Sequence, residues 1–275
     1  KCPIIITVHD IAYLRLPNLL NTSRKVYKKN ILQISIRKAK IIIADSYATK
    51  EDIIEYFGIR EEKIRVIHLG VESRFRPINN VEDFRLKNNL PSKMILNVGT
   101  LEPRKNVVSL IKAFRKLREM GFEDVKLVIA GNKGWLYQEI FKEVGQSGLK
   151  QEILFLGVVR DKDLPLLYNC ADIFVYPSLY EGFGLPPLEA MACGVPVITS
   201  NTSSLPEVIG DAGIMVDPTD INSLCESMYI LLKDKELWNR MRNMGLERSK
   251  LFSWDNTAEK ILKVYDEVFS MHKYQ

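Results

Sequence analysis

The sequence predicts an α/β fold with two parallel sheets, and three observations support this prediction. Short apolar runs rich in β-branched residues alternate with longer segments of helical periodicity, which is the pattern of βα units around a parallel sheet. The alternation occurs in two series, one on each side of a stretch at residues 70–77. The 275 residues are also enough for two ordinary domains, each with its own core.

The first series is short. It contains predicted strands at residues 4–8, 41–44 and 64–67, with helices over about 22–38 and 49–57. Three strands are few for a free-standing sheet. The chain also begins at Lys1 without an initiator Met and enters a strand within three residues. We therefore expect the first domain to be incomplete, with an upstream portion missing.

The second series predicts a six-stranded parallel sheet. Its strands are expected at residues 94–98, 125–129, 153–156, 173–176, 195–198 and 212–216, and each except the last leads into a helical segment. Two to three terminal helices follow, from about 221 to 269, because the sequence there is periodic and lacks strand runs.

The composition excludes several classes of protein. Apolar residues make up 46% and charged residues 27%, which are ordinary values for a globular protein, and no apolar run approaches the ~20 residues that a membrane-spanning helix needs. The four cysteines lack CxxC or CxxH spacing, which argues against a zinc site and a disulfide framework. We expect a cytoplasmic protein.

Two adjacent cations follow the first strand of the second series. Arg104 and Lys105 lie in the loop at residues 99–106, between that strand and the next helix. Ligands of open parallel sheets bind where the loops leave the carboxyl ends of the strands. An arginine can bind two phosphate oxygens, a lysine adds a mobile charge, and the helix amides donate to anions. The alternative is a solvated turn before a helix.

A second candidate loop, at residues 180–190, follows the strand at 173–176. Its glycines allow backbone amides to approach a ligand closely, and Pro186 and Pro187 suit the first turn of a helix. Glu189 would then lie early in that helix and accept hydrogen bonds from ribose hydroxyls, and Glu181 on the loop would reach sugar hydroxyls. Alternatively, Glu189 complements the helix dipole and Glu181 is a surface turn residue.

These residues resemble a known family, the retaining nucleotide-sugar glycosyltransferases called group 1 or family 4. The strongest match is EGFGLPPLEAMACGVP at residues 181–196, in which the two glutamates of the family motif stand with seven residues between them. Further similar segments occur in the family's order: VHDIAYL at 8–14, ADSYATKEDI at 44–53, HLGVESRFRP at 68–77, NVGTLEPRKN at 97–106, AG at 130–131, FLGVVRDKDLPLLY at 155–168, SSLPEV at 203–208, GDAGIMVDP at 210–218 and FSWDNTAEKILKVYDEVF at 252–269.

The resemblance implies the GT-B fold, which consists of two Rossmann-like parallel-sheet domains, here with the first incomplete. It places the remaining part of the N-terminal acceptor-side domain at residues 1–75 and the donor-binding domain at 76–252. Residues 253–275 would form a terminal helix that packs back toward the first domain. The family's glycine-rich first loop and much of its acceptor pocket would lie upstream of Lys1.

The resemblance also implies roles for individual residues. Arg104 and Lys105 would neutralise the donor diphosphate in place of a metal ion, Glu181 would hold the transferred sugar, and Glu189 would bind the ribose. His9 resembles the histidine near the reacting sugar, although a lone His-Asp after a strand is more often a capping or packing residue. The catalytic set is then His9, Arg104, Lys105 and Glu181. The remaining donor-binding residues would be Gly99, Thr100, Gly131, Val158, Gly182, Phe183, Gly184 and Leu185.

The function implied is transfer of a hexosyl group from a nucleoside diphosphate sugar to a glycan or lipid-linked acceptor in polysaccharide biosynthesis. Mannose is the first candidate sugar and glucose from a UDP donor the second. The reaction would retain the anomeric configuration, and neither a cofactor nor a metal is expected. Two alternatives remain open. The chain is a nucleotide-binding fragment without turnover, or it is an epimerase or phosphorylase of the same fold.

A basic segment suggests one further partner. Residues 11–44 contain no Asp or Glu, and between Arg24 and Lys40 the cations accompany an apolar stripe of Tyr27, Ile31 and Ile34. Such a helix can rest on an anionic membrane. The alternative is a solvated helix that packs its apolar stripe inward. Nucleic acid is not expected, because the net charge of +5 is modest and no nucleic-acid-binding motif accompanies the basic segment.

Overall fold

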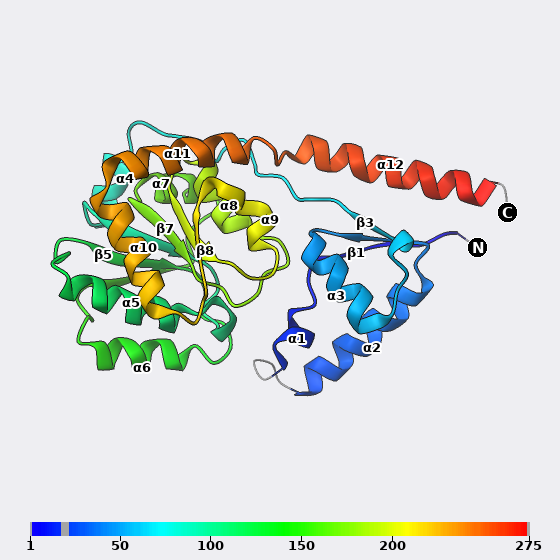
Figure 1. Ribbon diagram of the computed structural model, residues 1–275, viewed down its shortest axis with the longest axis horizontal. Coiled ribbons are helices and arrows are strands. Elements are labelled where there is room, and N and C mark those ends of the chain that lie inside the picture. The colour runs from blue at the N-terminus through cyan, green and yellow to red at the C-terminus, as the bar shows by residue number, and fades with distance from the viewer. Residues whose placement is uncertain (1, 18–21, 274–275) are drawn as a thin grey trace.

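The computed structural model describes residues 2–17 and 22–273, which form two α/β units joined by two crossing segments (Figure 1). Each unit has its own parallel sheet, with strand order β1-β2-β3 in the first and β6-β5-β4-β7-β8-β9 in the second. The prediction of two parallel sheets, one of three strands and one of six, is confirmed.

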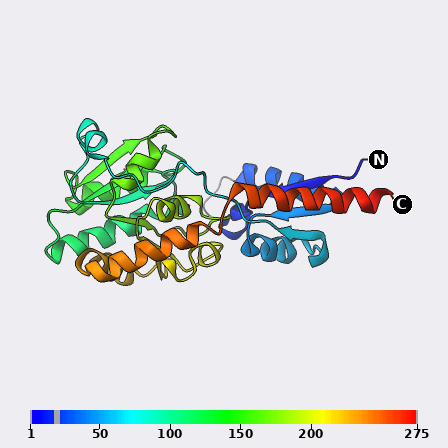
Figure 2. The same ribbon diagram turned by 90° about the horizontal axis from the view of Figure 1, so that it is seen from above.

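The first unit covers its small sheet on both faces. It consists of β1 (Ile5–Val8), α1 (Ala12–Arg15), α2 (Thr22–Lys38), β2 (Ile41–Ala44), α3 (Tyr47–Phe57), a 3-10 turn (Glu61–Lys63) and β3 (Ile64–Val66). Ile36 and Ile53 of α2 and α3 pack on one face. Val264 and Val268 of α12 (Trp254–Lys273) pack on the other. Figures 1 and 2 show α12 leaving the second unit after α11 and lying along this sheet.

The second unit alternates strands and helices. Its strands are β4 (Met94–Val98), β5 (Lys126–Ala130), β6 (Ile153–Gly157), β7 (Ile173–Tyr176), β8 (Val197–Ser200) and β9 (Ile214–Val216). Its helices are α4 (Glu82–Lys87), α5 (Val107–Glu119), α6 (Gln138–Ser147), α7 (Leu164–Asn169), α8 (Leu185–Ala192), α9 (Leu205–Ile209), α10 (Ile221–Lys233) and α11 (Lys235–Ser249), with 3-10 turns at Pro103–Lys105 and Gly210–Ala212. Helices α10, α11 and α12 are the terminal helices that were predicted from about residue 221 onward.

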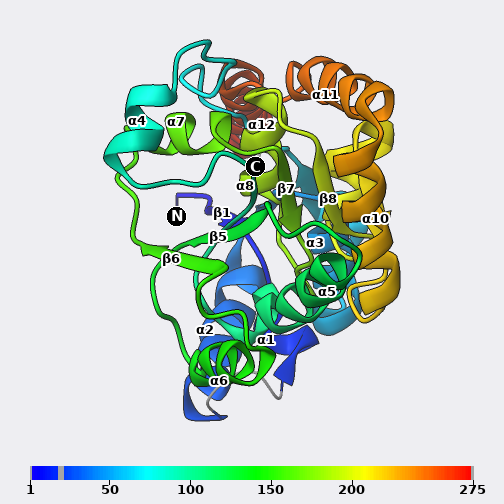
Figure 3. The same cartoon turned by 90° about the vertical axis from the view of Figure 1, so that its left-hand side faces the viewer.

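Both faces of the second sheet are buried, which explains its continuous apolar strands. Successive side chains of a strand point to opposite faces. Met94 and Leu96 accordingly belong to the core shared with α7 and α8, whereas Ile95 belongs to the core shared with α5, α6 and α10. Figure 3 shows α4 and α7 on one side of the sheet and α5 and α6 on the other.

A few predicted boundaries were wrong, for local reasons. β8 begins at Val197, two residues later than predicted, because Pro196 has no N–H to donate to the sheet. Helix α3 begins at Tyr47, two residues earlier than predicted, because the Ser46 side chain accepts a hydrogen bond from the N–H of Thr49 and caps the helix. The short helices α1 and α4 were not predicted.

The two segments that cross between the units lie against each other. Val71 pairs with Ser253 in an isolated parallel bridge, and the Thr257 hydroxyl donates to the His68 carbonyl at 2.7 Å. A Cβ atom on Gly70 would lie 2.2 Å from the backbone nitrogen of Trp254, so only glycine allows this approach. Both crossings therefore form one packed connection.

Within residues 2–17 and 22–273, no helix is long and apolar enough to cross a membrane.

Candidate functional site

The candidate site lies where the strand order of the second sheet reverses. The chain runs outward from β4 through β5 to β6, and then from β7 through β8 to β9 on the other side of β4. The loops after β4 and β7 therefore diverge from neighbouring strands, and the crevice at such a reversal is the usual ligand site of an open α/β sheet. The first is the loop predicted at residues 99–106, and the second, at 177–184, contains the start of the segment predicted at 180–190, whose remainder lies in α8 (Leu185–Ala192).

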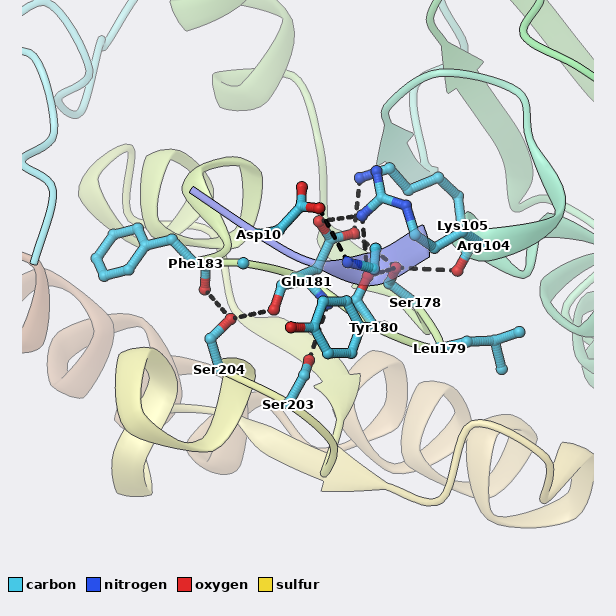
Figure 4. A network of polar contacts seen from close by, with 12 residues as sticks. Asp10, Arg104, Lys105, Ser178, Leu179, Tyr180, Glu181, Phe183, Ser203 and Ser204 are labelled. Atoms are coloured by element: carbon cyan, nitrogen blue, oxygen red, sulfur yellow. Dashed lines mark hydrogen bonds and ion pairs between the residues drawn. The ribbon is translucent and has the colours of Figure 1, made fainter. Parts of the chain in front are cut away.

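Their charged residues meet in one cluster (Figure 4). One carboxylate oxygen of Glu181 lies 2.8 Å from Nη1 of Arg104. The other lies 2.6 Å from Nζ of Lys105. The Ser178 hydroxyl donates to the same carboxylate at 2.6 Å, and Arg104 also binds Glu102 at 2.8 Å. Glu181, which is 77 and 76 positions away from Arg104 and Lys105 in sequence, is thus brought into direct contact with both cations.

The cluster is buried, and this shifts the acidity of its members. Burial alone would raise the pKa of Glu181, but Lys105 and Arg104 outweigh it and lower that pKa. Burial lowers the pKa of Lys105, an effect that Glu181 opposes. For Glu102, burial dominates and raises the pKa. Glu181 is accordingly held as a carboxylate between two cations, and it is not the exposed turn residue of the alternative reading.

Serines from the loop after β8 fix the backbone around Glu181. Ser203 accepts the N–H of Glu181 at 2.9 Å, and Ser204 donates to the carbonyl oxygens of Glu181 and Phe183 at 3.0 and 2.7 Å. Phe183 points away from the cations (Figure 4), and its ring is buried beside Phe252. Gly184 has φ +114° as the residue before α8, a conformation that glycine adopts without strain.

Leu185 begins α8, and the two prolines after it have no N–H. Backbone N–H groups in front of this helix are therefore found at Phe183, Gly184 and Leu185, and their role in donor binding stays a prediction. Glu189 lies one turn further along, half-buried, and accepts a hydrogen bond from the hydroxyl of Tyr168 at 2.8 Å. Burial raises the pKa of Glu189 to about 7, against the opposing effects of Tyr168 and Arg74. Burial therefore favours the protonated form of this carboxyl more than is usual for a glutamate.

The other predicted donor-binding residues surround the loop after β4. A Cβ on Gly131 would lie 1.9 Å from the carbonyl oxygen of Gly99, so these two glycines bring neighbouring loops into contact. Thr100 is exposed, and its methyl group leaves no room for a Cβ on Gly134. Val158 follows β6 and is 72% exposed, two strands away from β4 in the sheet. It is the predicted residue placed furthest along the sheet from the charged cluster.

The first unit contributes His9, which follows β1. Its Nδ1 lies 2.6 Å from the buried carboxylate of Asp45, which follows β2, while the imidazole side chain is 73% exposed. A carboxylate partner of this kind fixes the ring orientation of a histidine. Gly182 lies directly beneath, because a Cβ there would be 2.0 Å from the His9 carbonyl oxygen. His9 is therefore held over the loop that carries Glu181.

Several members of the site were missed by the sequence analysis. Glu102, Ser178 and Tyr176, whose hydroxyl lies 2.5 Å from Lys105, complete the buried cluster. Asp45 orients His9. Asp45 was open to prediction, since it follows a buried strand at the same sheet edge as His9. The others depend on side-chain packing that no local pattern indicates.

Two models of glycosyltransferase families match the chain. The family model "Glycosyl transferases group 1" matches residues 79–248, and "Glycosyltransferase Family 4" matches residues 1–75. An O-antigen chain mannosyltransferase B of Escherichia coli is 36% identical over 95% of this chain and 69% of its own length. A serotype-specific mannosyltransferase of the same species is 34% identical over 87% of this chain, which spans only 31% of that protein.

A solved structure has the same fold. The HepE protein of Anabaena, in complex with UDP and glucose, matches 96% of this chain and 71% of its own with a TM-score of 0.84 at 20% identity. The architecture of this chain is thus that of GT-B glycosyltransferases, as predicted.

Proposed function

Because the chain belongs to the group 1 glycosyltransferases, we propose that it transfers a hexosyl group, with retention of configuration, from a nucleoside diphosphate sugar to a glycan or lipid-linked acceptor. One observation carries the proposal. Arg104 and Lys105 converge with Glu181 at the strand-order reversal, where an anionic donor would lie. The chain spans 69% of one named relative and 31% of the other, so the activity of the whole protein is part of the proposal.

The charges of the cluster suit a leaving diphosphate. Negative charge develops on the diphosphate as the glycosidic bond breaks, and fixed cations and amides stabilise such charge before it forms. Arg104 and Lys105 would meet it from one side and the amides before α8 from the other. We propose that these residues replace a metal ion. Transfer is then expected to continue in the presence of a chelator such as EDTA, and loss of transfer that added Mg²⁺ restores would contradict this.

Glu181 and His9 are proposed as ligands of the transferred sugar. The Glu181 carboxylate keeps its charge within the cluster, and His9 is held above the loop by Asp45. The leaving phosphate oxygen would itself help to deprotonate the acceptor hydroxyl, which requires accurate positioning more than a separate strong base. Retention is tested by NMR of the product, in which the anomeric coupling constant distinguishes an α from a β linkage.

Mannose is the proposed sugar. The named relatives include two mannosyltransferases from Escherichia coli, one of which acts on the O-antigen chain. We propose that this chain likewise takes part in polysaccharide synthesis. GDP-mannose is the first donor to test and UDP-glucose the second, because the structurally similar HepE binds UDP and glucose.

Calorimetric titration with UDP, GDP, ADP and the matching nucleotide sugars tests the donor site. One nucleotide is expected to bind, and Arg104→Ala and Glu189→Ala are each expected to weaken it by about 10- to 100-fold, the effect of losing a charged hydrogen bond. Arg115→Ala, an exposed arginine on α5, is the control and should bind as the parent does. Binding that is unchanged in both site variants would refute the assignment.

The raised pKa of Glu189 predicts a pH dependence of donor binding. A carboxylate accepts hydrogen bonds from ribose better than a carboxylic acid does, so binding favours the ionised form. With a pKa of about 7 in the unliganded protein, affinity for the nucleotide sugar should rise about tenfold between about pH 6 and about pH 8. The nucleotide sugar is the right probe, because its diphosphate does not titrate in this range. Glu189→Gln should abolish the rise, and an equal rise in that variant would contradict the prediction.

The raised pKa of Glu189 has the opposite effect on the stability of the unliganded protein. Because the folded-state pKa of Glu189 lies above its ordinary value of 4.5, this group favours the unliganded fold most below about pH 4.5. Its contribution is lost as the pH rises through about 7. Higher pH is therefore expected to weaken the empty protein while it strengthens donor binding.

We also propose that α2 rests on an anionic membrane. Ile31 and Ile34 are 46% and 55% exposed, so the alternative that these two residues pack inward is wrong, and Arg37 and Lys38 beside them are exposed. The side chains of residues 22–29, which include Tyr27 and Arg24, lie outside the described part. Sedimentation with phosphatidylglycerol vesicles should retain the protein and release an Ile31→Ser, Ile34→Ser variant. Leu251→Ser, an exposed residue elsewhere, is the control, and equal retention of all three would refute the contact.

A further inference from the structure

Helix α3 of the first unit has an unusual N-terminus. The first N–H groups of a helix have no partner within the helix and must be satisfied from outside. The N–H of Thr49 binds the side chain of Ser46, but α3 has no acidic residue in its first turn. The N–H groups of Tyr47 and Ala48 instead donate to the two carboxylate oxygens of Glu207, at 2.9 and 3.2 Å.

Glu207 belongs to the other unit. It lies in α9 (Leu205–Ile209). Arg248 donates hydrogen bonds to carbonyl groups near the end of this helix, among them the carbonyl of Glu207 at 2.6 Å. Its carboxylate also lies 3.0 Å from Nε2 of His68, on a segment that crosses between the units. The side chain is only 19% exposed. A carboxylate at a helix N-terminus interacts favourably with the helix dipole, so this contact attracts the two units to each other.

The same helix touches the loop that carries Glu181. The Thr49 hydroxyl lies 3.3 Å from the carbonyl oxygen of Gly182, and the Tyr180 hydroxyl donates to Asp52 at 2.5 Å. Asp52 is buried and is held in turn by Arg15. The residues on either side of Glu181 are therefore both fastened to α3, and α3 is fastened to Glu207.

We propose that Glu207 is a positioning residue, which holds α3 against the donor-binding unit and thereby places His9 and the Glu181 loop in register for transfer. The inference rests on the proposed function. Glu207 contacts neither of the cations at the site. It acts through α3, Thr49 and Asp52, so its loss should misplace the reacting groups while the nucleotide-binding residues stay intact.

The test separates turnover from donor affinity in the full-length protein. Glu207→Ala and Glu207→Gln are compared with Glu267→Gln. Glu267 lies on α12, away from the site, and its carboxylate is of similar exposure and pairs with Arg65 of β3. We expect kcat to fall by about 10- to 100-fold in Glu207→Ala, as small misplacements of reacting groups do, and less in Glu207→Gln, which keeps one acceptor. The Kd for the donor nucleotide should stay within about twofold, and the control should keep its kcat.

A second comparison guards against a simple loss of stability. Asp52→Asn loosens α3 from Tyr180, so the double variant with Glu207→Ala should lose less activity than the two single effects combined. An unchanged kcat in Glu207→Ala, or an equal loss of kcat in Glu267→Gln, would overturn the inference. If the parent protein transfers sugar and only Glu207 proves neutral, the proposed function stands. If the parent transfers no sugar from any donor, the proposed function itself fails.

Discussion

Alanine in place of Lys105 is expected to lower kcat/KM for sugar transfer by about 100- to 1,000-fold. Glu181 and Tyr176 fix the Lys105 ammonium in a buried position. In the proposed reaction it would therefore stabilise the transition state without first changing its position. Removal of one such preorganised group from a charge-stabilising site has effects of this size. Steady-state kinetics over a range of donor concentrations, with circular dichroism to confirm folding, measure the effect.

The matched control for this prediction is Lys112→Ala. Lys112 lies on α5, the helix that follows the same loop, and pairs loosely with Glu143 at 3.8 Å. Its loss should leave kcat/KM within about twofold, because surface ion pairs contribute little. A folded Lys105→Ala variant that retained more than about a tenth of the parent activity would contradict a role for this lysine in stabilising the leaving diphosphate.

Glutamine in place of Glu181 is expected to damage both activity and stability. The substitution keeps the volume of the side chain but removes the charge that compensates buried Lys105 and Arg104. Breaking a buried ion pair by removing one partner costs about 3–5 kcal/mol, so thermal unfolding should occur at a clearly lower temperature. Sugar transfer should fall by about 100-fold or more, since the proposed sugar ligand and the position of both cations are lost.

A double variant separates these two effects. Replacing both partners, as Lys105→Met with Glu181→Gln, removes the uncompensated charge and should recover much of the lost stability, because neutral groups of similar shape tolerate burial. Activity should remain lost. Recovery of activity together with stability would mean that the cluster holds the fold and takes no part in transfer.

The architecture could be read from the sequence because it depends on local patterns. The strands of the second sheet are buried on both faces, so they appear as continuous apolar runs, and the helices between them show an apolar stripe. The boundaries that were wrong depend on single groups, such as the missing N–H of Pro196 and the cap by Ser46. Helix α1 covers only four residues, Ala12–Arg15, too few to show a period.

The site was predictable to the extent that its residues lie on strand-end loops. Arg104, Lys105 and Glu181 were identified because parallel strands bring their carboxyl ends to one edge. The pairing between them was not predicted, because it depends on side-chain packing between two loops that are far apart in sequence. No local pattern in α9 indicates that Glu207 reaches the first unit, because that contact depends on how the two units are oriented.

Helix α12 has a consequence for biosynthesis. Its Val264 and Val268 cover Ile41, Ile43 and Ile67 on one face of the first sheet, although the whole second unit is made between Ile67 and Val264. During synthesis, that apolar face of the first unit therefore stays uncovered while the second unit emerges from the ribosome and folds. The twenty residues of α12, Trp254–Lys273, complete the cover of this face. Until they appear, the nascent chain exposes a surface of the kind that chaperones bind.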